Sequence, residues 1–380
     1  MRGISFQSDL FQISYASEKI KLLPKEYELF QLLYQHPARI FSRRALLDRL
    51  WPMSDPVDRT VDDHIYRLRK KLAPLSDVVT IRTVRGQGYV LDQQSSSESN
   101  PLSEDLELAD NVGKLFRKYH LYGQGDALRL MSENQSVFGV ELDASSQLYL
   151  YFMNGDFENL LHVEHIDFWE KCYYLLHLHF YACKDTEKSL SYFTKALNYD
   201  QLPHQHKLEI RLLNRLSLLI LTKNLDEAAV LLEESKEKII DGDLEGFVLI
   251  LYLMELGFVF LQQNETAIEI GIARIESELI KRPFSREKAL FSIMQGMYQL
   301  YKGNPASAQE SIADGFAQFR KAKYVPGIFQ SLKVIITFLE EYDDYPELQA
   351  YYATQLEQYK ENFRLTQLYP YISRELVKHL

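Results

Sequence analysis

The spacing of hydrophobic residues changes along the first hundred positions of the chain. Around Ile4, Ile13 and Ile20, apolar and polar residues alternate, which predicts three or four short strands. A helical spacing begins at Pro24, a residue type that fits the first turn of a helix. A second helix is expected after Ser42, whose hydroxyl can cap the first turn.

The third helical segment covers residues 60–72 and is strongly amphipathic. Its apolar residues recur every three or four positions and predict a buried stripe formed by Val61, Ile65, Leu68 and Leu72. The opposite face and its flanks hold Asp63, Tyr66, Arg67, Arg69, Lys70 and Lys71. So many cations at the end of a helix suit a phosphate backbone, although runs of charge are more often solvated surface.

Two further strands are predicted after this helix, at residues 79–85 and 89–91. They are joined through Arg85, Gly86, Gln87 and Gly88, and the two glycines allow positive φ in a tight turn. Arg85 is then expected at the tip of a hairpin, from which an arginine can enter a narrow minor groove.

Composition and charge divide the chain near residue 95. Residues 1–95 contain 15 Lys and Arg against 11 Asp and Glu, whereas the remaining residues contain 28 against 42. A basic head on an acidic body indicates that only the head meets a polyanion such as double-stranded DNA. Residues 93–104 hold no aromatic or β-branched residue, so we expect a flexible linker between a domain of residues 1–92 and a body of residues 105–380.

Three segments of the head resemble the winged-helix DNA-binding domain of the OmpR/PhoB class of bacterial regulators. They are LLPKEYELFQLLYQHPARIFSRRALLDRLW, DRTVDDHIYRLRKKL and IRTVRGQGYVL, which occur in the family's order and spacing. The resemblance implies an α+β winged helix-turn-helix fold. It also implies that the third helix enters the major groove and that the hairpin wing reaches the minor groove.

The resemblance assigns roles to individual positions. Phosphate contacts are implied for Arg59, His64, Arg69, Thr83 and Tyr89. Positions that face bases are Asp62, Asp63, Tyr66 and Arg67, the wing arginine is Arg85, and Thr60 and Lys70 complete the candidate DNA-binding set. The family commonly has an apolar residue at Asp63 and a basic or polar one at Tyr66. An aspartate accepts a hydrogen bond from cytosine N4 and is repelled by phosphate, so the preferred operator should differ.

Two expectations concern control of the head. Family members touch RNA polymerase through the loop that corresponds here to Pro52–Asp58. Response regulators of the class also have a receiver domain before the winged helix, whereas here the winged helix opens the sequence. Because residues 105–380 show no strand–helix alternation of the receiver kind, we expect signals to arrive through this body.

The body shows helical periodicity almost throughout and repeats about every 40 residues. Turns are predicted at Lys184-Asp185, Lys223-Asn224, Gln263-Asn264, Gly303-Asn304 and Asp343-Asp344. Small residues follow most of these turns, at Ser189, Ala228, Ala267 and Ala308. Gly257 and Gly296 are small residues on the helices that precede two of the turns. This pattern resembles an all-α, tetratricopeptide-like solenoid, a domain suited to sensing or dimerisation.

A stack of this kind forms a concave groove that binds a peptide, a small ligand, a protein partner or a second copy of itself. Candidate lining residues from the first helix of each pair are Tyr174, His177, Tyr181, Arg211, Asn214, Arg215, Tyr252, Glu255, Gln295 and Tyr298. The alternative is that these side chains form interfaces between helices, which is the more frequent role of aromatic stripes at helical spacing.

The sequence offers little for catalysis or cofactors. Several histidines lie near Cys172, but His177 and His179 would point to nearly opposite sides of a helix, so we expect no metal site. No phosphate-binding glycine loop, nucleophile elbow or zinc-hydrolase helix is present, so we expect neither an enzyme nor a cofactor. Two cysteines, no export leader and no apolar run of about 20 residues lead us to expect a cytoplasmic protein outside the membrane.

We therefore expect a cytoplasmic, nucleoid-associated one-component transcription regulator that acts as a homodimer. Its winged helix would bind promoter DNA in a sequence-specific way, and its helical body would control that binding. A receptor for a secreted peptide is one special case. The alternative is an interaction scaffold with a weakly DNA-binding head, which the acidic Asp63 on the reading face favours.

Overall fold

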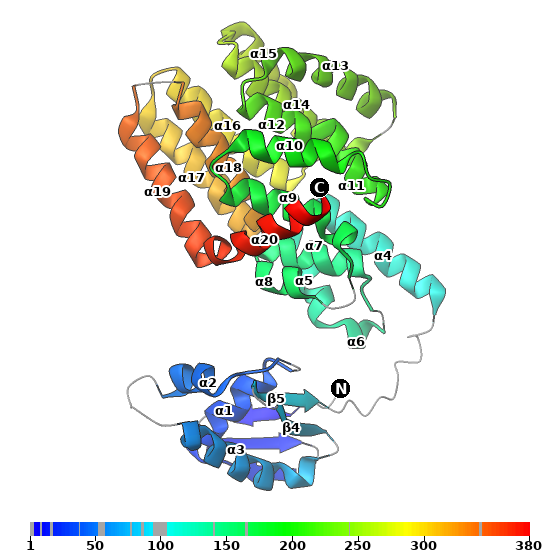
Figure 1. Cartoon of the computed structure of the whole chain (residues 1–380), viewed down its shortest axis with the longest axis vertical. Helices are drawn as coiled ribbons and strands as arrows, with labels where there is room; N and C mark the ends of the chain where they lie inside the picture. Colours follow the sequence, from blue (N-terminus) through cyan, green and yellow to red (C-terminus); the bar gives the residue numbers. More distant parts are fainter. Residues whose placement is uncertain are drawn as a thin grey trace. The chain divides into compact units, whose positions relative to one another are not determined.

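The computed structural model describes residues 4–7, 10–15, 18–37, 39–51, 58–76, 78–84, 87–93, 105–139, 141–163, 166–242, 244–341 and 344–380. The chain separates into two compact units with the main boundary after residue 104, except that residues 136–139 are grouped with the first unit. Figure 1 shows the helices and strands of each unit, with labels on the helices and on β4 and β5. Each unit has its own hydrophobic core, so the two are described separately.

The first unit is an α+β domain with two small antiparallel sheets. Its elements are β1 (Ser5–Gln7), β2 (Gln12–Tyr15), β3 (Glu18–Lys21), α1 (Pro24–Tyr34), α2 (Arg43–Leu50), α3 (Asp58–Leu72), the 3₁₀ turn Ala73–Leu75, β4 (Val79–Val84) and β5 (Gly88–Gln93). Strands β1, β2 and β3 pair in chain order, and β4 pairs with β5. Of the three or four strands predicted before the first helix, the described residues form three.

Local sequence explains where the helices begin. Ser42 Oγ accepts a hydrogen bond from the Ala45 backbone N–H at 3.1 Å and caps α2, as predicted. At the start of α1, Glu26 reaches back and accepts from the Leu23 N–H at 2.9 Å. Helix α3 begins at Asp58, two residues earlier than predicted.

The apolar stripe of α3 lies in the core of this domain. Val61, Ile65, Leu68 and Leu72 are all buried, which confirms the predicted face. Strand β5 extends to Gln93, which pairs with Val79, so the predicted linker starts one residue too early. Gln93 remains part of β5 because Val79, the first residue of β4, lies opposite it in the sheet. Residues 94–104 of that linker lie outside the described residues.

The second unit is all-α within the described residues, which confirms the predicted fold class. Its helices are α4 (Leu106–Leu121), α5 (Gly125–Glu133), α6 (Gln135–Phe138), α7 (Ala144–Asn154), α8 (Phe157–His162), α9 (Phe168–Ala182), α10 (Thr186–Ala196), α11 (His204–Glu209), the π-helical segment Ile210–Asn214, α12 (Arg215–Leu221), α13 (Leu225–Asp241), α14 (Glu245–Leu261), α15 (Glu265–Lys281), α16 (Ser285–Tyr301), α17 (Pro305–Lys321), α18 (Val325–Leu339), α19 (Pro346–Asn362) and α20 (Leu365–His379).

The helices from α9 onward form solenoid-like helix–turn–helix pairs with short turns at the predicted places. Lys223, Gln263 and Gly303 adopt positive φ and reverse the chain between the members of a pair. Lys184 and Asp185 separate α9 from α10, with Asp185 in an extended conformation rather than at positive φ. Of the fifth predicted turn, Asp344 is described and Asp343 lies outside the described residues.

Small residues bring α16 and α17 close together, but not every predicted small residue does so. A Cβ on Gly296 would lie 2.5 Å from Ile312 Cγ1 and 2.8 Å from the Ala308 carbonyl oxygen. A Cβ on Gly257 would meet only Met294 Cε at 3.7 Å, an ordinary contact. The prediction of a close approach is therefore wrong at Gly257. It also fails at Ala267, which is half-buried because Ile268 takes the fully buried position beside it.

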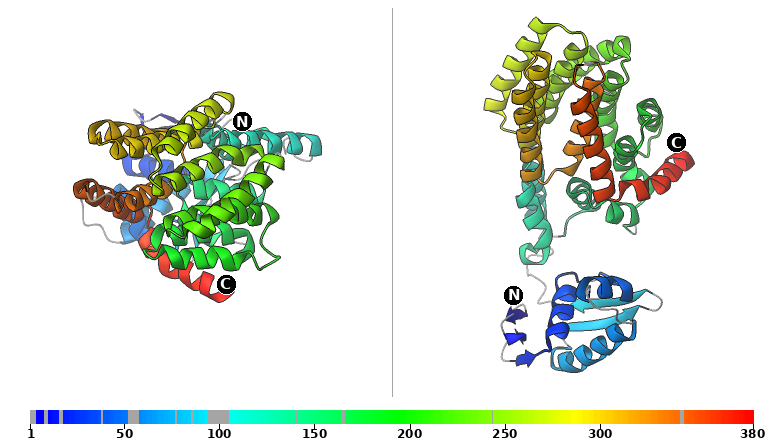
Figure 2. Two further views of the ribbon diagram at one scale, coloured as in Figure 1. Left: turned by 90° about the horizontal axis from the view of Figure 1, so that it is seen from above. Right: turned by 90° about the vertical axis from the view of Figure 1, so that its left-hand side faces the viewer.

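The helical unit curls so that its early and late helices touch. Helix α9 contacts α18 and α20, and α7 contacts α18 (Figures 1 and 2). Lys333 of α18 donates to the Cys183 carbonyl oxygen at 2.7 Å, and the Phe157 and Phe329 rings pack 6.1 Å apart. None of the described helices combines the length and apolar character needed to cross a bilayer.

Candidate nucleic-acid interface

Helix α3 has one face in the core of the first unit and an opposite face in solvent. Asp63, Tyr66, Arg67 and Lys70 are all exposed, and Tyr66 keeps 67% of its surface accessible. Among the described residues, none of these four has a hydrogen-bond or ion-pair partner. Arg59, in the first turn of α3, is also exposed. The structure therefore brings together the base-facing residues expected at 63, 66 and 67.

Two of the four cations at positions 67–71, Arg69 and Lys71, bond to other residues of the domain. Arg69 donates from Nε to the Ile81 carbonyl oxygen at 2.7 Å and from Nη2 to Thr83 Oγ1 at 2.8 Å. Lys71 pairs at 2.6 Å with Glu26, whose side chain is fully buried. The run of four cations thus divides into two free side chains, Arg67 and Lys70, and two that fasten α3 to its neighbours.

Asp62, which the sequence places among the base-facing residues, has its carboxylate turned to two partners inside the domain. Asp62 Oδ1 accepts from Arg43 Nε at 2.7 Å and from the Tyr89 hydroxyl at 2.5 Å. Arg43 Nη2 also donates to the Tyr89 hydroxyl at 3.1 Å. The three residues belong to α2, α3 and β5, so this cluster ties the helix-turn-helix to the wing strand.

Burial and hydrogen bonds together set the ionisation of this cluster. Burial alone raises the pKa of the Asp62 carboxyl, but the hydrogen bonds from Arg43 and Tyr89 bring that pKa below its ordinary value. Burial and the hydrogen bond to Asp62 both raise the pKa of Tyr89. The carboxylate is therefore charged and the phenol neutral at pH 7, which keeps Tyr89 as the donor.

The remaining predicted contacts differ in accessibility. Tyr89 is only 4% exposed, so its ring is part of the core rather than of the open surface. His64 Nδ1 lies 2.7 Å from the Thr60 carbonyl oxygen, and the His64 ring packs edge-on against Trp51. Thr60 and His64 are half-buried, while Thr83 is exposed beside Arg69.

The wing begins at a glycine that no other residue could replace without strain. Gly88 has φ +138°, and a Cβ there would lie 2.0 Å from the Phe41 carbonyl oxygen. Phe41 and Tyr89 exchange two backbone hydrogen bonds of 2.8 and 2.9 Å at this point. The wing residues Arg85 and Gly86, and residues 52–57 of the loop expected to touch RNA polymerase, lie outside the described residues.

Comparison with known proteins agrees with this geometry. The family described as "Transcriptional regulatory protein, C terminal" matches residues 17–91. Residues 17–91 form an OmpR/PhoB-type winged-helix DNA-binding domain. The third helix described above and most of the β4–β5 hairpin lie within these matched residues.

Individual relatives match the winged-helix domain alone. The heme response regulator HssR of Staphylococcus epidermidis is 43% identical over 83 residues, which are 22% of this chain and 37% of HssR. The phosphate regulon transcriptional regulatory protein PhoB of Escherichia coli is 39% identical over 90 residues, or 23% of this chain and 39% of PhoB. The match thus spans about two fifths of the length of these relatives.

Solved structures match over the same part of the chain. The DNA-binding domain of response regulator AdeR, solved in complex with an intercistronic region, is 29% identical with a TM-score of 0.22, covering 24% of this chain and 97% of that one. The DNA-binding domain of Escherichia coli CadC is 30% identical with a TM-score of 0.22, covering 23% and 84%.

Outside the winged-helix domain, the ten candidate groove residues range from buried to exposed. Tyr174 and Tyr181 are buried, and His177 lies between them, with its Nδ1 3.5 Å from the Tyr181 hydroxyl. The others are mostly held by neighbouring helices. Arg215 pairs with Glu227. Glu255 pairs with Lys236 and with Arg274, and Arg274 also lies over the Tyr252 ring. Gln295 donates to Glu276, and Tyr298 donates to Glu269. Arg211 is exposed and Asn214 half-buried.

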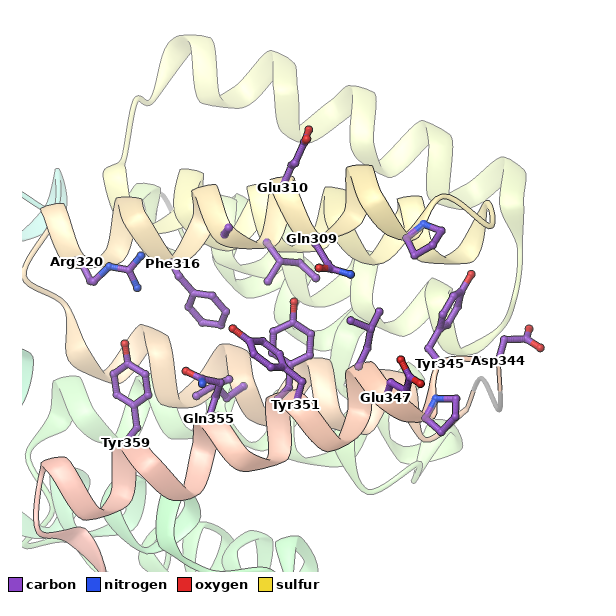
Figure 3. A pocket seen from close by; sticks show the side chains of 17 residues that line it. Gln309, Glu310, Phe316, Arg320, Asp344, Tyr345, Glu347, Tyr351, Gln355 and Tyr359 are labelled. Carbon is purple, nitrogen blue, oxygen red and sulfur yellow. The ribbon is translucent and has the colours of Figure 1, made fainter.

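A groove that the sequence reasoning missed lies between α17 and α19. It encloses about 970 Å³, and Phe316, Tyr351 and Tyr359 point into it (Figure 3). None of the ten candidate residues lines it. The available signal was the seven-residue spacing of Tyr352 and Tyr359, which puts two tyrosines on one face of a helix, with Tyr345 seven residues earlier at the start of α19.

The histidines of the helical unit are divided between separate contacts. His177 packs with Tyr173 and Phe193, whereas His179 Nδ1 lies 3.0 Å from Ser189 Oγ. His206 stacks on Tyr173 at 4.4 Å. Among the described residues, no group of three or more His, Cys, Asp or Glu side chains is arranged to hold a metal ion.

Proposed function

We propose that this protein is a transcription regulator that binds promoter DNA in a sequence-specific manner through α3. The observation behind this proposal is the division of α3 into a fully buried stripe and an exposed face with Asp63, Tyr66, Arg67 and Lys70. A helix of this kind fits the major groove of B-DNA, and base edges there can be distinguished by hydrogen bonding.

The residues of the domain divide into three roles in this proposal. Asp63, Tyr66 and Arg67 read base edges, and Arg59 and Lys70 contact phosphates. Arg69, Thr83 and Tyr89 act mainly by holding the third helix against the wing, since their polar atoms already bond within the domain. Arg85 would reach the minor groove, and residues 52–58 would touch RNA polymerase.

The helical body would control DNA binding. Its described residues contain helices and no strand, so they do not form a receiver with alternating strands and helices. Solenoid-like stacks expose extended surfaces for ligands and for self-association. We place a small ligand, a peptide, a protein partner or a second copy of the chain on this tetratricopeptide-like body, with the homodimer acting at the nucleoid in the cytoplasm.

The test is a titration of the full chain against labelled DNA from upstream of its own gene and against shuffled DNA of equal length. Fluorescence anisotropy over a series of salt concentrations should show preference for the natural DNA. Because phosphate contacts release counterions, affinity should fall as salt rises. Equal affinity for both DNAs at every salt concentration would contradict sequence-specific binding.

A second candidate function is an interaction scaffold whose head binds DNA weakly. The exposed carboxylate of Asp63 favours it, because a negative charge on the reading face repels phosphate. The scaffold predicts that both the full chain and residues 1–93 bind natural and shuffled DNA equally. A preference shown by residues 1–93 alone supports the regulator instead.

A further inference from the structure

Arg286 is a cation of the helical body that forms no ion pair with any carboxylate of the described residues. It is the second residue of α16, and its Nη1 donates to the Tyr149 hydroxyl at 3.1 Å. Its Nε is enclosed by protein and has no acceptor among the described residues. No described carboxylate lies within ion-pair distance of it, whereas Arg282, four residues earlier, pairs with Glu245 and Glu278.

Aromatic side chains surround this guanidinium. Arg286 Cζ lies 5.2 Å from the centre of the Tyr324 ring. The His120 ring stacks on Tyr149 at 4.0 Å with an angle of 12° between the planes. A Cβ on Gly123 would lie 3.1 Å from Arg286 Cγ, so the turn after α4 packs directly on the arginine stem. Helices α4, α7 and α16 therefore meet at this residue.

Solvent nevertheless reaches the side chains around Arg286. Tyr149, Tyr324 and Arg286 each keep part of their surface accessible, and so do Tyr173 and Glu209 on the neighbouring α9 and α11. Tyr173 donates to Glu209 at 2.7 Å, and Glu209 interacts electrostatically with Arg286. A charge in such surroundings is costly unless a counterion or hydrogen-bond acceptors compensate for it.

We propose that the cluster of Arg286, Tyr149, Tyr324 and His120 binds a small organic oxyanion, a carboxylate or phosphate ester with a flat apolar body. The guanidinium supplies the positive charge and the remaining N–H donors that such a group requires. The tyrosine rings supply flat apolar surfaces for the remainder of the ligand. The ligand would join α4 and α7 to α16, segments far apart in the sequence.

Two buried acidic groups interact with Arg286. Burial raises the pKa of Glu209 and of Glu287, the residue after Arg286, and the charge of Arg286 opposes this rise. Burial in turn disfavours the charge of Arg286, but Tyr149, Glu287, Tyr324 and Glu209 raise its pKa, so the guanidinium is charged. Burial and the charge of Arg286 also lower the pKa of His120 to about 3, so this ring stays neutral and contributes a stacking surface.

The first experiment measures the melting temperature of the full chain in a Tris-chloride buffer, with benzoate, phenyl phosphate, acetate, inorganic phosphate or benzamidine as probes. Benzoate or phenyl phosphate should raise the melting temperature in a saturable way. Acetate and inorganic phosphate, which lack the ring, should have smaller effects, and the cation benzamidine should have none. A response to inorganic phosphate but not to benzoate would limit the site to phosphate chemistry. No saturable response to any of the four anions would overturn the proposal.

The second experiment compares Arg286→Met with Arg282→Met. Removing a buried charge that forms no ion pair among the described residues should leave the probe-free protein about as stable as wild type, and should weaken probe binding about 10- to 100-fold. Arg282→Met removes an ion-paired arginine and should leave probe binding unchanged. A large drop in the probe-free melting temperature of Arg286→Met would instead show a structural arginine and contradict the proposal.

Arg286→Lys keeps the proposal testable if Arg286→Met does not fold, because lysine keeps the positive charge and lacks only the planar guanidinium. It should retain weakened binding of benzoate and phenyl phosphate, and binding equal to wild type would contradict a guanidinium-specific site. All these measurements omit DNA. Their failure would therefore leave the DNA-binding proposal standing, and failure of DNA binding would leave the oxyanion site testable.

Discussion

Tyr89 of the wing strand donates its hydroxyl hydrogen to Asp62 of the recognition helix across 2.5 Å. Arg43 of the preceding helix bonds to both partners, so one cluster connects three elements of the domain. The position of the recognition helix relative to the wing thus depends on side chains separated by 19 to 46 residues along the chain. Disturbing this cluster should change DNA binding without removing any exposed cation.

Replacing Tyr89 with phenylalanine tests this relationship. The variant keeps the ring and removes the donor, so it should lower the free energy of unfolding of the domain by about 1–3 kcal/mol. Urea unfolding of residues 1–93, followed through the fluorescence of Trp51, measures the loss. Tyr15→Phe, on β2, is the control and should change stability much less. If Tyr89→Phe is fully additive with Asp62→Asn, the two residues are not coupled.

The neighbouring lysines Lys70 and Lys71 should behave differently when each is changed to alanine. Lys70→Ala should flatten the plot of log affinity against log salt by about 0.9, since one phosphate contact is lost, and should leave the melting temperature unchanged. Lys71→Ala leaves the buried carboxylate of Glu26 without its partner and should lower stability with little change in the salt slope. Equal behaviour of the two variants in both assays would contradict the assigned roles.

Asp63 should influence which bases are preferred. Asp63→Asn replaces an acceptor for cytosine N4 with a side chain that pairs well with adenine, and it removes repulsion from phosphate. Selection from a random DNA library should therefore show a changed base at one position together with tighter binding overall. Glu18→Gln, on β3, removes the same charge away from α3 and should leave the selected sequence unchanged. An identical selected sequence for Asp63→Asn would place Asp63 outside base recognition.

Gly296 and Gly257 occupy similar places on α16 and α14 but have different surroundings. Gly296→Ala should destabilise the helical body by about 1–3 kcal/mol, because its Cβ would overlap Ile312. Gly257→Ala should be neutral or stabilise by about 0.5–1 kcal/mol, because alanine restricts the unfolded chain and meets no clash. Thermal unfolding followed by circular dichroism compares the two, and a similar loss in both would refute the close approach at Gly296.

Buried histidines should make the helical body sensitive to mild acid. Burial lowers the pKa of His177 to about 3 and that of His206 to about 4. Below pH 6.5 the unfolded chain takes up these protons while the folded chain does not, so stability present at pH 7 is lost as pH falls toward 4. Each histidine contributes at most about 1.4 kcal/mol per pH unit.

His206→Gln should reduce the dependence of unfolding free energy on pH between 5 and 6.5. His204→Gln, on the same helix but exposed, is the matched control and should keep the wild-type slope. Urea unfolding at several pH values, followed by circular dichroism, provides both slopes. Equal slopes for the two variants would show that His206 titrates alike in the folded and unfolded chains.

Local sequence was sufficient for the elements of the winged helix and for the turns of the helical pairs. The stripe Val61 to Leu72 recurs at helical spacing, so its buried face follows from periodicity alone. The role of Lys71 could not be read in the same way, because its partner Glu26 lies 45 residues earlier. Likewise, Gly257 and Gly296 repeat at the same spacing, and only packing distinguishes the tight contact from the loose one.

The amino-acid order by itself determined the two-part organisation, the amphipathic recognition helix, the glycine at the start of the wing strand and the repeating helix pairs. These features depend on interactions between residues a few positions apart. Within the described residues, the tertiary structure decided which cations of α3 have no partner, how Asp62, Arg43 and Tyr89 meet, and that Arg286 packs among tyrosines without an ion pair. Such arrangements depend on which distant side chains approach one another, and chain folding sets those distances.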